Sequence, residues 1–291
     1  MSSINTSVLM SDAHHFNNTQ QINPYYHHEG VNINRAITEH NALREMLSEA
    51  GIKVIITESP FDSQDGVYTA NWALVKGDKA VLARLPEARK SEEDFAERVL
   101  IDLGKQVFRV PEGLKFSGQG DALACGNLLF CGSGYRSDEA AQEFAAKKLG
   151  YERIQLKTVP QLDANGNPVI NPTTGWPDSY FYDIDLALAV IKPPTLFQKG
   201  LIAYCPEAFT EESREKIEKV KSVDKIAVSL DEARKGFATN LISNGETVVM
   251  SVRAPQLSNE LRKRGLKVLM PEIYELAKGG GYIRCMTLTI N

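Results

Sequence analysis

A cysteine near the C-terminal end of the sequence follows a run of three glycines. The glycines occupy residues 279–281, and Cys285 comes shortly after them. Consecutive glycines let a backbone turn sharply or approach a ligand closely. Behind them, residues 283–290 alternate as a strand would. We therefore expect Cys285 near the start of the last strand, with its thiol presented to a pocket. The alternative is a small cysteine buried in the core.

Two aspartates separated by one residue form a second candidate site. Asp183 and Asp185 flank Ile184, and residues two apart on a strand share one face. Neighbouring carboxylates resist ionising together, so the pKa of at least one should rise, and the pair should attract a cation. The alternative is that Asp183 is a solvated or hydrogen-bonded loop residue.

Histidines are confined to the first forty residues, at positions 14, 15, 27, 28 and 40. Any reaction that needs a histidine must take it from this segment or proceed without one. Adjacent side chains on a strand point to opposite faces, so the two His-His pairs are poor chelates. We interpret these pairs as solvated loop histidines and expect no metal site.

The elements that would position these residues recur along the chain as a hairpin, a helix and a returning strand, with a period of roughly 50 residues. Hairpins are expected within residues 72–83, 122–131, 184–204 and 241–250, and a first strand at residues 7–10. Helices are expected at residues 35–50, 91–104, 137–150, 210–220 and 256–264, each followed by a strand at residues 52–57, 106–110, 153–156, 226–228 and 267–270. Four helices have a glycine stop, at Gly51, Gly104, Gly150 and Gly265, since glycine adopts the left-handed conformation without penalty.

Five units of this kind each expose an apolar sheet face and must pack together. The sequence therefore predicts an α/β fold, a five-bladed α/β propeller around a central channel, with residues 1–291 forming a single domain. The last strand, residues 283–290, should pair with the first unit. A doubly wound sheet is the competing architecture, but it has one strand per helix and no intervening hairpins. Residues 161–180, rich in Asn, Gly and Pro, are expected to form a surface loop or lid.

Composition narrows the class of protein. The chain has 291 residues, 43% of them hydrophobic and 24% charged, with a net charge of −4. These values are ordinary for a globular protein and give no reason to expect nucleic acid or an anionic membrane as partner. No apolar run approaches the ~20 residues of a membrane span. The scattered cysteines at 125, 131, 205 and 285 favour a reducing cytoplasm over a disulfide framework or a zinc site.

Several short stretches together resemble the amidinotransferase and guanidino-modifying superfamily, also called penteins, which includes dimethylarginine dimethylaminohydrolase, arginine deiminase and arginine dihydrolase. In order along the chain, the matching stretches are Ile22–Pro24, Val67–Asn71, Gly120–Leu123, Gly134–Asp138, Phe237–Asn240 and Gly280–Leu288. The resemblance spans nearly the whole chain and also implies a five-bladed α/β propeller.

The resemblance implies a covalent reaction on a guanidinium group. A cysteine thiolate attacks the guanidinium carbon, an amine leaves, and water or another amine resolves the thiouronium intermediate. By position, Cys285 matches the nucleophile. Substrate contacts are expected from Asp65, Asn71, Asp121, Arg136 and Asp185, where the fork of Arg136 suits a substrate carboxylate.

The sequence departs from the family pattern at two positions. Asp183 stands where the family has its acid/base histidine, and Ser117 stands where an acidic residue usually precedes Gly-x-Gly-Asp. General acid–base help is worth about 10² to 10⁴ in rate, so Asp183 must act as an atypical acid/base if the chain is an enzyme. The expected partner is a small arginine-like guanidino compound, without a cofactor, and a homodimer is left open. Hydrolase and amidinotransferase remain alternatives, beside a non-catalytic ligand binder and an interaction protein.

Overall fold

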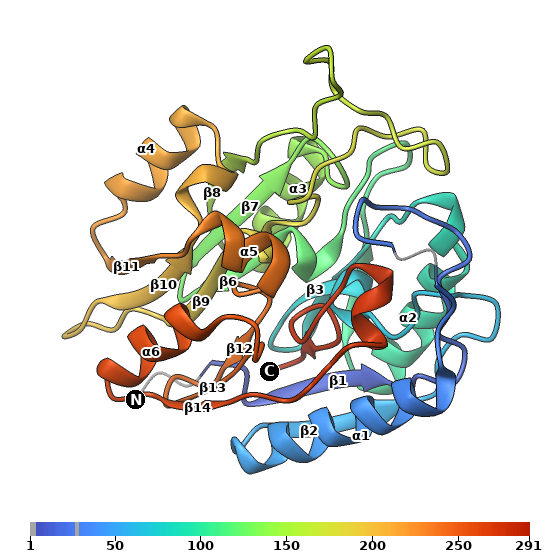
Figure 1. The fold of residues 1–291 in the computed structure, drawn as a ribbon, viewed down its shortest axis with the longest axis horizontal. Helices are drawn as coiled ribbons and strands as arrows, with labels where there is room; N and C mark the ends of the chain where they lie inside the picture. Colours follow the sequence, from blue (N-terminus) through green and yellow to red (C-terminus); the bar gives the residue numbers. More distant parts are fainter. Residues whose placement is uncertain (1–3, 27–28) are drawn as a thin grey trace.

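The computed structural model describes residues 4–26 and 29–291 and arranges them in five small three-stranded sheets (Figure 1). In each sheet the middle strand pairs antiparallel with one neighbour and parallel with the other. The strand orders are β15-β1-β2, β3-β4-β5, β6-β7-β8, β9-β10-β11 and β12-β13-β14. The predicted hairpin, helix and returning strand therefore recur four times, and in the first sheet a strand from the other end of the chain takes the place of the first hairpin strand.

The strands are short. The first two sheets contain β1 (Ser7–Ser11), β2 (Lys53–Thr57), β15 (Leu288–Thr289), β3 (Ala73–Lys76), β4 (Lys79–Leu82) and β5 (Gln106–Arg109). The third and fourth contain β6 (Ala122–Cys125), β7 (Leu128–Ser133), β8 (Glu152–Lys157), β9 (Leu188–Lys192), β10 (Gly200–Tyr204) and β11 (Val223–Ala227). The fifth contains β12 (Ile242–Ser243), β13 (Thr247–Val249) and β14 (Lys267–Leu269).

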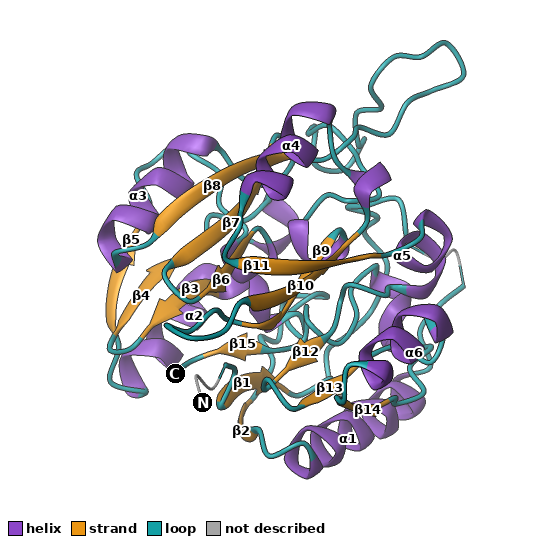
Figure 2. Ribbon diagram, turned by 90° about the vertical axis from the view of Figure 1, so that its left-hand side faces the viewer, coloured by secondary structure: helices purple, strands orange, loops and turns teal. Residues whose placement is uncertain are grey.

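One helix connects the middle strand of each sheet to its parallel neighbour. These helices are α1 (Ile33–Glu49), α2 (Ser91–Asp102), α3 (Glu139–Leu149), α4 (Glu211–Lys219) and α6 (Pro255–Lys263). Figure 2 shows them at the periphery of the molecule, outside the sheets. A further helix that the sequence did not predict, α5 (Leu230–Gly236), lies between β11 and β12. The glycine stops are confirmed: all four have positive φ, between 66° at Gly150 and 80° at Gly265.

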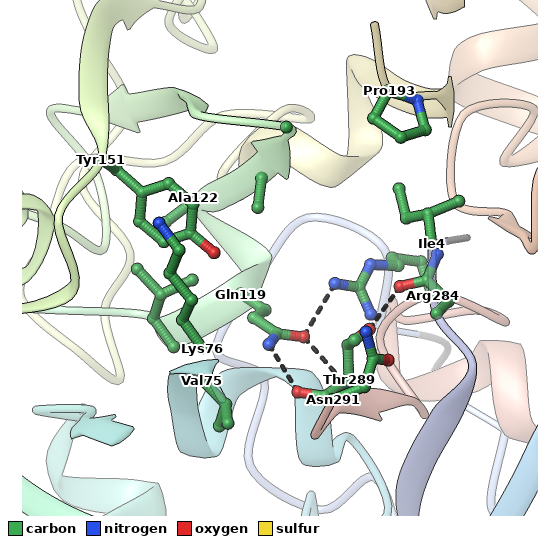
Figure 3. Close-up of a pocket in the computed structure, with 14 residues that line it drawn as sticks. Ile4, Val75, Lys76, Gln119, Ala122, Tyr151, Pro193, Arg284, Thr289 and Asn291 are labelled. Carbon is green, nitrogen blue, oxygen red and sulfur yellow. Dashed lines mark hydrogen bonds between the residues drawn. The ribbon is translucent and has the colours of Figure 1, made fainter. Parts of the chain in front are cut away.

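The predicted pairing between the two ends of the chain is present. Val8 in β1 pairs with Thr289, and Leu9 pairs with Leu288, so β15 completes the first sheet. The first strand of each sheet lies nearest the centre of the molecule. One central cavity is lined by Leu74, Ala122 and Thr289 from these strands (Figure 3). An adjoining cavity is lined by Leu188 and by Leu241, which directly precedes β12.

Two segments predicted as strands have other conformations. The predicted strand at 184–191 begins with a 3-10 helix, Ile184–Leu186, and β9 starts only at Leu188. The predicted last strand at 283–290 is a turn until Leu288. Within it the Met286 amide donates to the Tyr282 carbonyl at 3.2 Å. The interpretation of Asp183 and Asp185 as residues on one strand face is therefore wrong. The alternating apolar residues of these segments predicted strands. The segments are instead buried turns, and burial on every side requires the same apolar residues that a central strand would have.

The remaining sequence predictions concern surfaces and cysteines. Residues 161–180 form an irregular loop with two isolated antiparallel bridges, Leu162 to Pro168 and Ile170 to Pro177. Cys125, Cys131 and Cys205 are free and buried. Among residues 4–26 and 29–291, no helix combines the length and apolar character that a membrane span needs.

Candidate active site

Cys285 lies in the turn that precedes β15, with its side chain directed into the protein and the residue only 2% exposed. The side chain of Asn240 holds it from two directions. The Asn240 Nδ2 donates to the sulfur at 3.1 Å, and its Oδ1 accepts from the Cys285 amide at 3.1 Å. The thiol itself donates to Oδ2 of Asp185 at 3.4 Å. The sulfur is thus fixed beside a carboxylate.

Three aspartates gather around this thiol. Asp183 and Asp185 lie at the start of the 3-10 helix Ile184–Leu186, and Asp121 follows the 3-10 helix Gly118–Gly120. Asp121 is tied to the first pair because its Oδ1 accepts the Ile184 amide at 3.0 Å. Each of the three is buried, and each has one carboxylate oxygen without a hydrogen-bond partner among the described residues. Buried polar atoms are nearly always paired, so these three oxygens lack the partners that a folded protein ordinarily supplies.

Burial and mutual repulsion raise the pKa values of this group. Burial is the main cause for the carboxyl groups of Asp121 and Asp185, and the charge of Asp183 raises both pKa values further. The Cys285 thiol has its pKa raised well above its usual range by burial and then by the charges of Asp185 and Asp183. Without a bound cation, the thiol form of Cys285 is therefore favoured.

Asn71 and Ser117 complete one side of the aspartate group. Asn71 lies in the 3-10 helix Thr69–Trp72, and its Nδ2 donates to Asp183 Oδ2 at 2.8 Å and to the Ser117 hydroxyl at 2.9 Å. Gly120 makes this approach feasible, since a Cβ there would lie 2.6 Å from Asp183 Oδ2 and 2.5 Å from Asn71 Nδ2. Ser117 occupies its position as a hydrogen-bonded neutral group and supplies no charge.

Arg136 brings a positive charge against the aspartates. Its guanidinium stacks over the Tyr182 ring at 3.9 Å from the centroid, and its Nη1 lies 4.0 Å from Asp183 Oδ2. Its Nη2 donates to the Ile22 carbonyl at 3.0 Å. Arg136 is buried, and the charge of Asp183 helps to raise its pKa although burial opposes this. In this arrangement the guanidinium compensates Asp183.

Asp65 belongs to a second, fully paired group of buried charges. Both of its carboxylate oxygens accept the Tyr26 hydroxyl, at 2.7 and 2.6 Å. Arg89 donates to the Asp65 carbonyl at 3.2 Å and to both oxygens of Glu92, at 2.8 and 2.7 Å. Its Nη1 also donates to Asn71 Oδ1 at 2.7 Å, which links the two groups. Burial raises the pKa of Asp65, and Arg89 opposes that rise.

The glycine run is explained by close packing against Tyr68. A Cβ on Gly281 would lie 2.5 Å from Tyr68 Cε1, and one on Gly279 would lie 2.6 Å from the Tyr68 hydroxyl oxygen. Gly280 has φ of 85° and lies against Asn23. The run thus turns the chain and admits the Tyr68 ring, whose hydroxyl donates to the Leu276 carbonyl at 2.6 Å.

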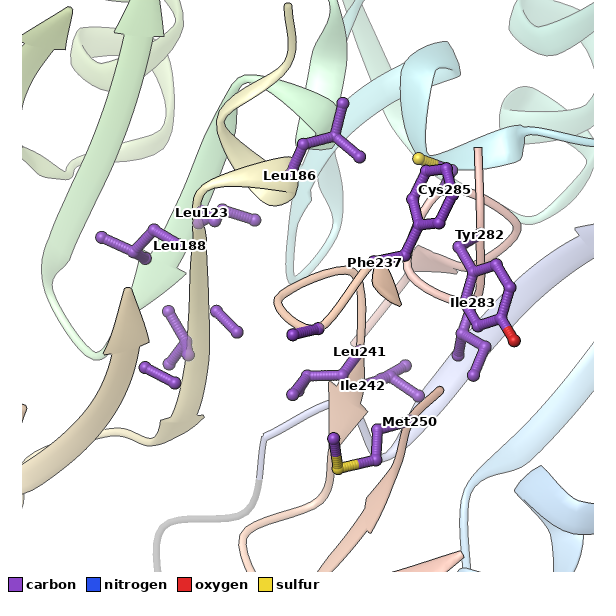
Figure 4. Close-up of a cluster of buried hydrophobic side chains, with 14 of the residues drawn as sticks. Leu123, Leu186, Leu188, Phe237, Leu241, Ile242, Met250, Tyr282, Ile283 and Cys285 are labelled. Atoms are coloured by element: carbon purple, nitrogen blue, oxygen red, sulfur yellow. The ribbon is translucent and has the colours of Figure 1, made fainter. Parts of the chain in front are cut away.

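Phe237 and Tyr282 form a stacked pair, with ring centroids 5.3 Å apart, and belong to the same buried cluster as Cys285 (Figure 4). Phe237 has φ of 51°, a conformation that is a genuine outlier for a bulky residue. The sequence analysis did not assign a role to Phe237 or Asn240, although both stand in the stretch Phe237–Asn240 that carried the resemblance. The sequence offers one indication of a functional residue here, because Asn240 is a polar residue within an apolar run.

Metal-binding side chains do not gather here. Within the described part of the chain, no group of three or more His, Cys, Asp or Glu side chains is arranged to hold a metal ion. His14 is an exposed turn residue whose Nδ1 lies 3.1 Å from Asp12 Oδ2, whereas His40 is buried in α1. His27 and His28, which the sequence analysis interpreted as solvated, lie outside the described residues.

Known proteins resemble the chain over almost its whole length. The profile of the family described as N,N dimethylarginine dimethylhydrolase, eukaryotic, matches residues 8–291. The N(G),N(G)-dimethylarginine dimethylaminohydrolase of Mycobacterium tuberculosis is 31% identical over 90% of the chain and 77% of its own length. The bifunctional arginine dihydrolase/ornithine cyclodeaminase AgrE of Nostoc sp. is 30% identical over 97% of the chain. The chain spans only 37% of the length of AgrE and of its Synechocystis counterpart ArgZ.

Solved structures agree with these matches. The N-terminal domain of ArgZ, an arginine dihydrolase from cyanobacteria, superposes with a TM-score of 0.84 at 26% identity and covers 98% of the chain and 97% of that domain. That domain has been solved with substrate and, as a variant, covalently bound to a reaction intermediate. A dimethylarginine dimethylaminohydrolase shares the fold at a TM-score of 0.73 and 16% identity.

Proposed function

The chain belongs to the N,N-dimethylarginine dimethylhydrolase family of guanidino-modifying enzymes, and on that premise we propose that it hydrolyses an arginine-like guanidino compound through a covalent intermediate on Cys285. The observation that carries this proposal is a group of three buried carboxylates, on Asp121, Asp183 and Asp185. Each has one oxygen without a hydrogen-bond partner among the described residues, and Asp185 also accepts the Cys285 thiol. A planar guanidinium offers several N–H donors and one positive charge. It would therefore supply both the hydrogen bonds and the charge that these carboxylate oxygens lack.

Binding of the guanidinium would also activate the nucleophile. Burial and the neighbouring carboxylates keep Cys285 as a thiol in the free protein. A cation placed against Asp183 and Asp185 cancels their repulsion and favours the thiolate, which is the reactive form. Asp185, which the thiol already contacts at 3.4 Å, is placed to accept its proton. Substrate charge and thiolate formation are thus coupled.

The proposed reaction has two halves. The Cys285 sulfur forms a bond to the guanidinium carbon, and the carbon–nitrogen bond to the leaving amine breaks. The proton that left the thiol is delivered to that amine through an aspartate, with Asp183 as the atypical acid in the place of the family histidine. Water then attacks the thiouronium carbon and gives up a proton to Asp183. The carbon–sulfur bond breaks, and the urea product and Cys285 are released. Amidino transfer would follow the same course with an amine in place of water.

The other residues would orient the substrate. Asn71 fixes the Asp183 carboxylate, and Arg136 would pair with a substrate carboxylate, for which its planar fork is suited. Asp65 would bind a further edge of the guanidinium once Tyr26 releases its carboxylate. The five sheets would form a closed propeller around the site. In support of this ring, β15 pairs with β1, and the first strands of all five units line the central cavities or lie beside their lining residues.

A non-catalytic guanidino-ligand binder is the second candidate, and one observation favours it. Arg136 and Asn71 both approach the same oxygen of Asp183, at 4.0 and 2.8 Å. These partners occupy one of the two oxygens through which Asp183 would otherwise exchange a proton with a leaving amine. Ser117 adds no second carboxylate that could orient the ligand.

Binding and turnover measured side by side test the proposal and separate the two candidates. Arginine and dimethylarginine would be titrated calorimetrically, and release of amine and urea product would be followed over hours. Hydrolysis by the wild-type protein that disappears in Asp183→Asn supports the enzyme. Binding without turnover indicates the ligand binder. Asp163→Asn is the matched control because Asp163 lies in an exposed loop, and it should behave as the wild type.

A further inference from the structure

A second region with a buried charge lies at Arg284, the residue directly before Cys285. A cavity of about 220 Å³ opens there, lined by the first strands of the second and third sheets and by residues next to the chain ends (Figure 3). A smaller cavity of about 30 Å³ adjoins it. Arg284, Ala124 and Asn5 line both cavities, so the Arg284 side chain lies between them.

Arg284 is a buried cation whose described hydrogen-bond partners are all neutral. Its Nη2 donates to Gln119 Oε1 at 2.8 Å, and its Nη1 donates to the Thr287 carbonyl at 2.5 Å. The residue is 8% exposed; burial lowers its pKa, and the charge of Asp185 opposes that change. Buried guanidinium groups ordinarily have a carboxylate as a direct hydrogen-bond partner, since an uncompensated buried charge is costly. Arg89 in the same molecule follows that rule with Glu92.

The larger cavity adds a second positive charge and no acidic side chain. Its charged lining side chains are Arg284 and Lys76, while the polar ones come from Gln119, Asn5, Tyr151, Thr289 and Asn291. In the smaller cavity, the Thr239 hydroxyl is buried and has no hydrogen-bond partner among the described residues. A hydroxyl can donate to an anion. Two cations and an unpartnered hydroxyl therefore face space that a negative group could occupy.

We propose that this pair of cavities is a binding site for a small oxyanion, with the Arg284 guanidinium as its principal ligand, Lys76 at its rim and Gln119 holding the guanidinium in place. The chemistry fits a carboxylate or a phosphate, because the Arg fork matches two oxygens of either group. The site is distinct from the aspartate group around Cys285 and has the opposite charge preference. It would take an anion while the active site takes a cation.

Thermal unfolding at constant ionic strength tests this site directly. Sodium acetate and inorganic phosphate would be titrated against sodium chloride held to the same ionic strength, with neutral acetamide as the shape control for acetate. The site predicts a saturable rise of the unfolding midpoint with acetate, phosphate or both, since a ligand that binds only the folded state stabilises it. Which of the two acts identifies the source of the oxyanion. No saturable rise with either, or an equal rise with acetamide, overturns the proposal.

Variants test whether the anion-dependent rise of the unfolding midpoint depends on Arg284. In Arg284→Gln the half-saturating anion concentration should rise at least about tenfold, because a charge-assisted bond is lost. In Lys76→Gln it should rise a few fold. Lys199→Gln is the control, since this exposed lysine lies outside both cavities, and the response should be unchanged. An undiminished response in Arg284→Gln contradicts the assignment.

A second variant covers the case in which Arg284→Gln does not fold. Ala124→Leu fills the space shared by the two cavities while leaving Arg284 and its partners in place. It should abolish the anion response although the protein still unfolds cooperatively. If Ala124→Leu responds to acetate and phosphate as the wild type does, the anion binds elsewhere and the proposal fails.

Discussion

Two groups of buried charge lie on either side of Asn71, and they are satisfied to different degrees. The paired group contains Asp65, Arg89 and Glu92. The Asp65 carboxylate accepts the Tyr26 hydroxyl with both oxygens, and the Glu92 carboxylate accepts from Arg89 and from the Trp72 indole N–H. The open group contains the aspartates around Cys285, each with an unpartnered oxygen. Asn71 bonds to both groups, through its oxygen to Arg89 and through its nitrogen to Asp183.

The two groups differ in whether their buried charges already have complete hydrogen bonding in the free protein. A buried ion pair with complete hydrogen bonding holds its elements together, and its loss leaves an uncompensated charge. Carboxylates with incomplete hydrogen bonding destabilise the free protein, and a proton or a bound cation relieves them. The open group therefore lowers the stability of the free protein, and a bound ligand would restore that stability. Each prediction below changes one group and uses the other as reference.

The largest expected effect follows removal of the cation in the paired group. Arg89→Met leaves Glu92 and Asp65 buried without their partner, which should lower the free energy of unfolding by about 3–5 kcal/mol. Urea denaturation measures it. Arg109→Met is the matched control, because Arg109 also contacts two carboxylates, Glu97 and Asp94, but on the surface. There the cost should be about 0–1 kcal/mol. Equal losses in the two variants would remove the distinction between the groups.

Restoring a histidine at position 183 should change activity next most strongly. In Asp183→His the imidazole supplies a general acid and base, and we expect turnover of an arginine-like substrate to rise by about 10². Recovery should be partial because Ser117 still supplies no carboxylate and Arg136 lies 4.0 Å from the present carboxylate. Steady-state product release measures the change. A rate that stays at the wild-type value would show that proton transfer at this position does not limit the reaction.

Asn240 should matter less, since only one of its two hydrogen bonds to Cys285 reaches the sulfur. Its Nδ2 donates to the Cys285 sulfur and helps to lower the pKa of the thiol. In Asn240→Ala, kcat should fall about tenfold, as expected for the loss of roughly 1.4 kcal/mol. Asn165→Ala, in the exposed loop, is the control. A variant that keeps the full kcat would show that Asn240 does not orient or activate the sulfur.

The smallest expected effect is a pH dependence of stability in the free protein. The folded-state pKa values of Asp121 and Asp185 are raised, so the folded protein keeps protons that the unfolded chain loses above about pH 4. Stability therefore falls as pH rises from about 4 towards the raised pKa values. Asp185→Asn should flatten this slope in urea unfolding. A slope that is unaltered, or reversed, would mean that Asp185 does not carry the raised pKa.

Much of the fold could be predicted from the sequence because its signals are local. Helix ends are marked by glycines with positive φ, such as Gly51 and Gly150, and hairpins by short turns such as Gly77-Asp78. The 3-10 helix Ile184–Leu186 and the turn at Cys285 could not be predicted in the same way. Their apolar alternation reflects burial on all sides, which a strand and a compact turn share.

The candidate site could be predicted in its residue types and only partly in its contacts. The matching stretches contain Cys285 and Asn71, and the departure from the family pattern identified Asp183. Which carboxylates are paired depends on residues distant in the chain, as with Tyr26, which lies 39 positions from Asp65. Likewise, Asn240 reaches Cys285 from 45 positions away. No local sequence pattern predicts contacts between residues so far apart in the chain. The division into a paired and an open group is therefore visible only in the structure.

The central claim is that Cys285 forms a covalent bond to a guanidino carbon. It is tested most directly by the intact mass of the protein after incubation with arginine or dimethylarginine and an acid quench. The wild-type protein should carry the mass of the amidino adduct, peptide mapping should place it on Cys285, and Cys285→Ser should carry none. Binding of the same compounds by calorimetry with neither adduct nor turnover would contradict the enzyme and leave a guanidino-ligand binder.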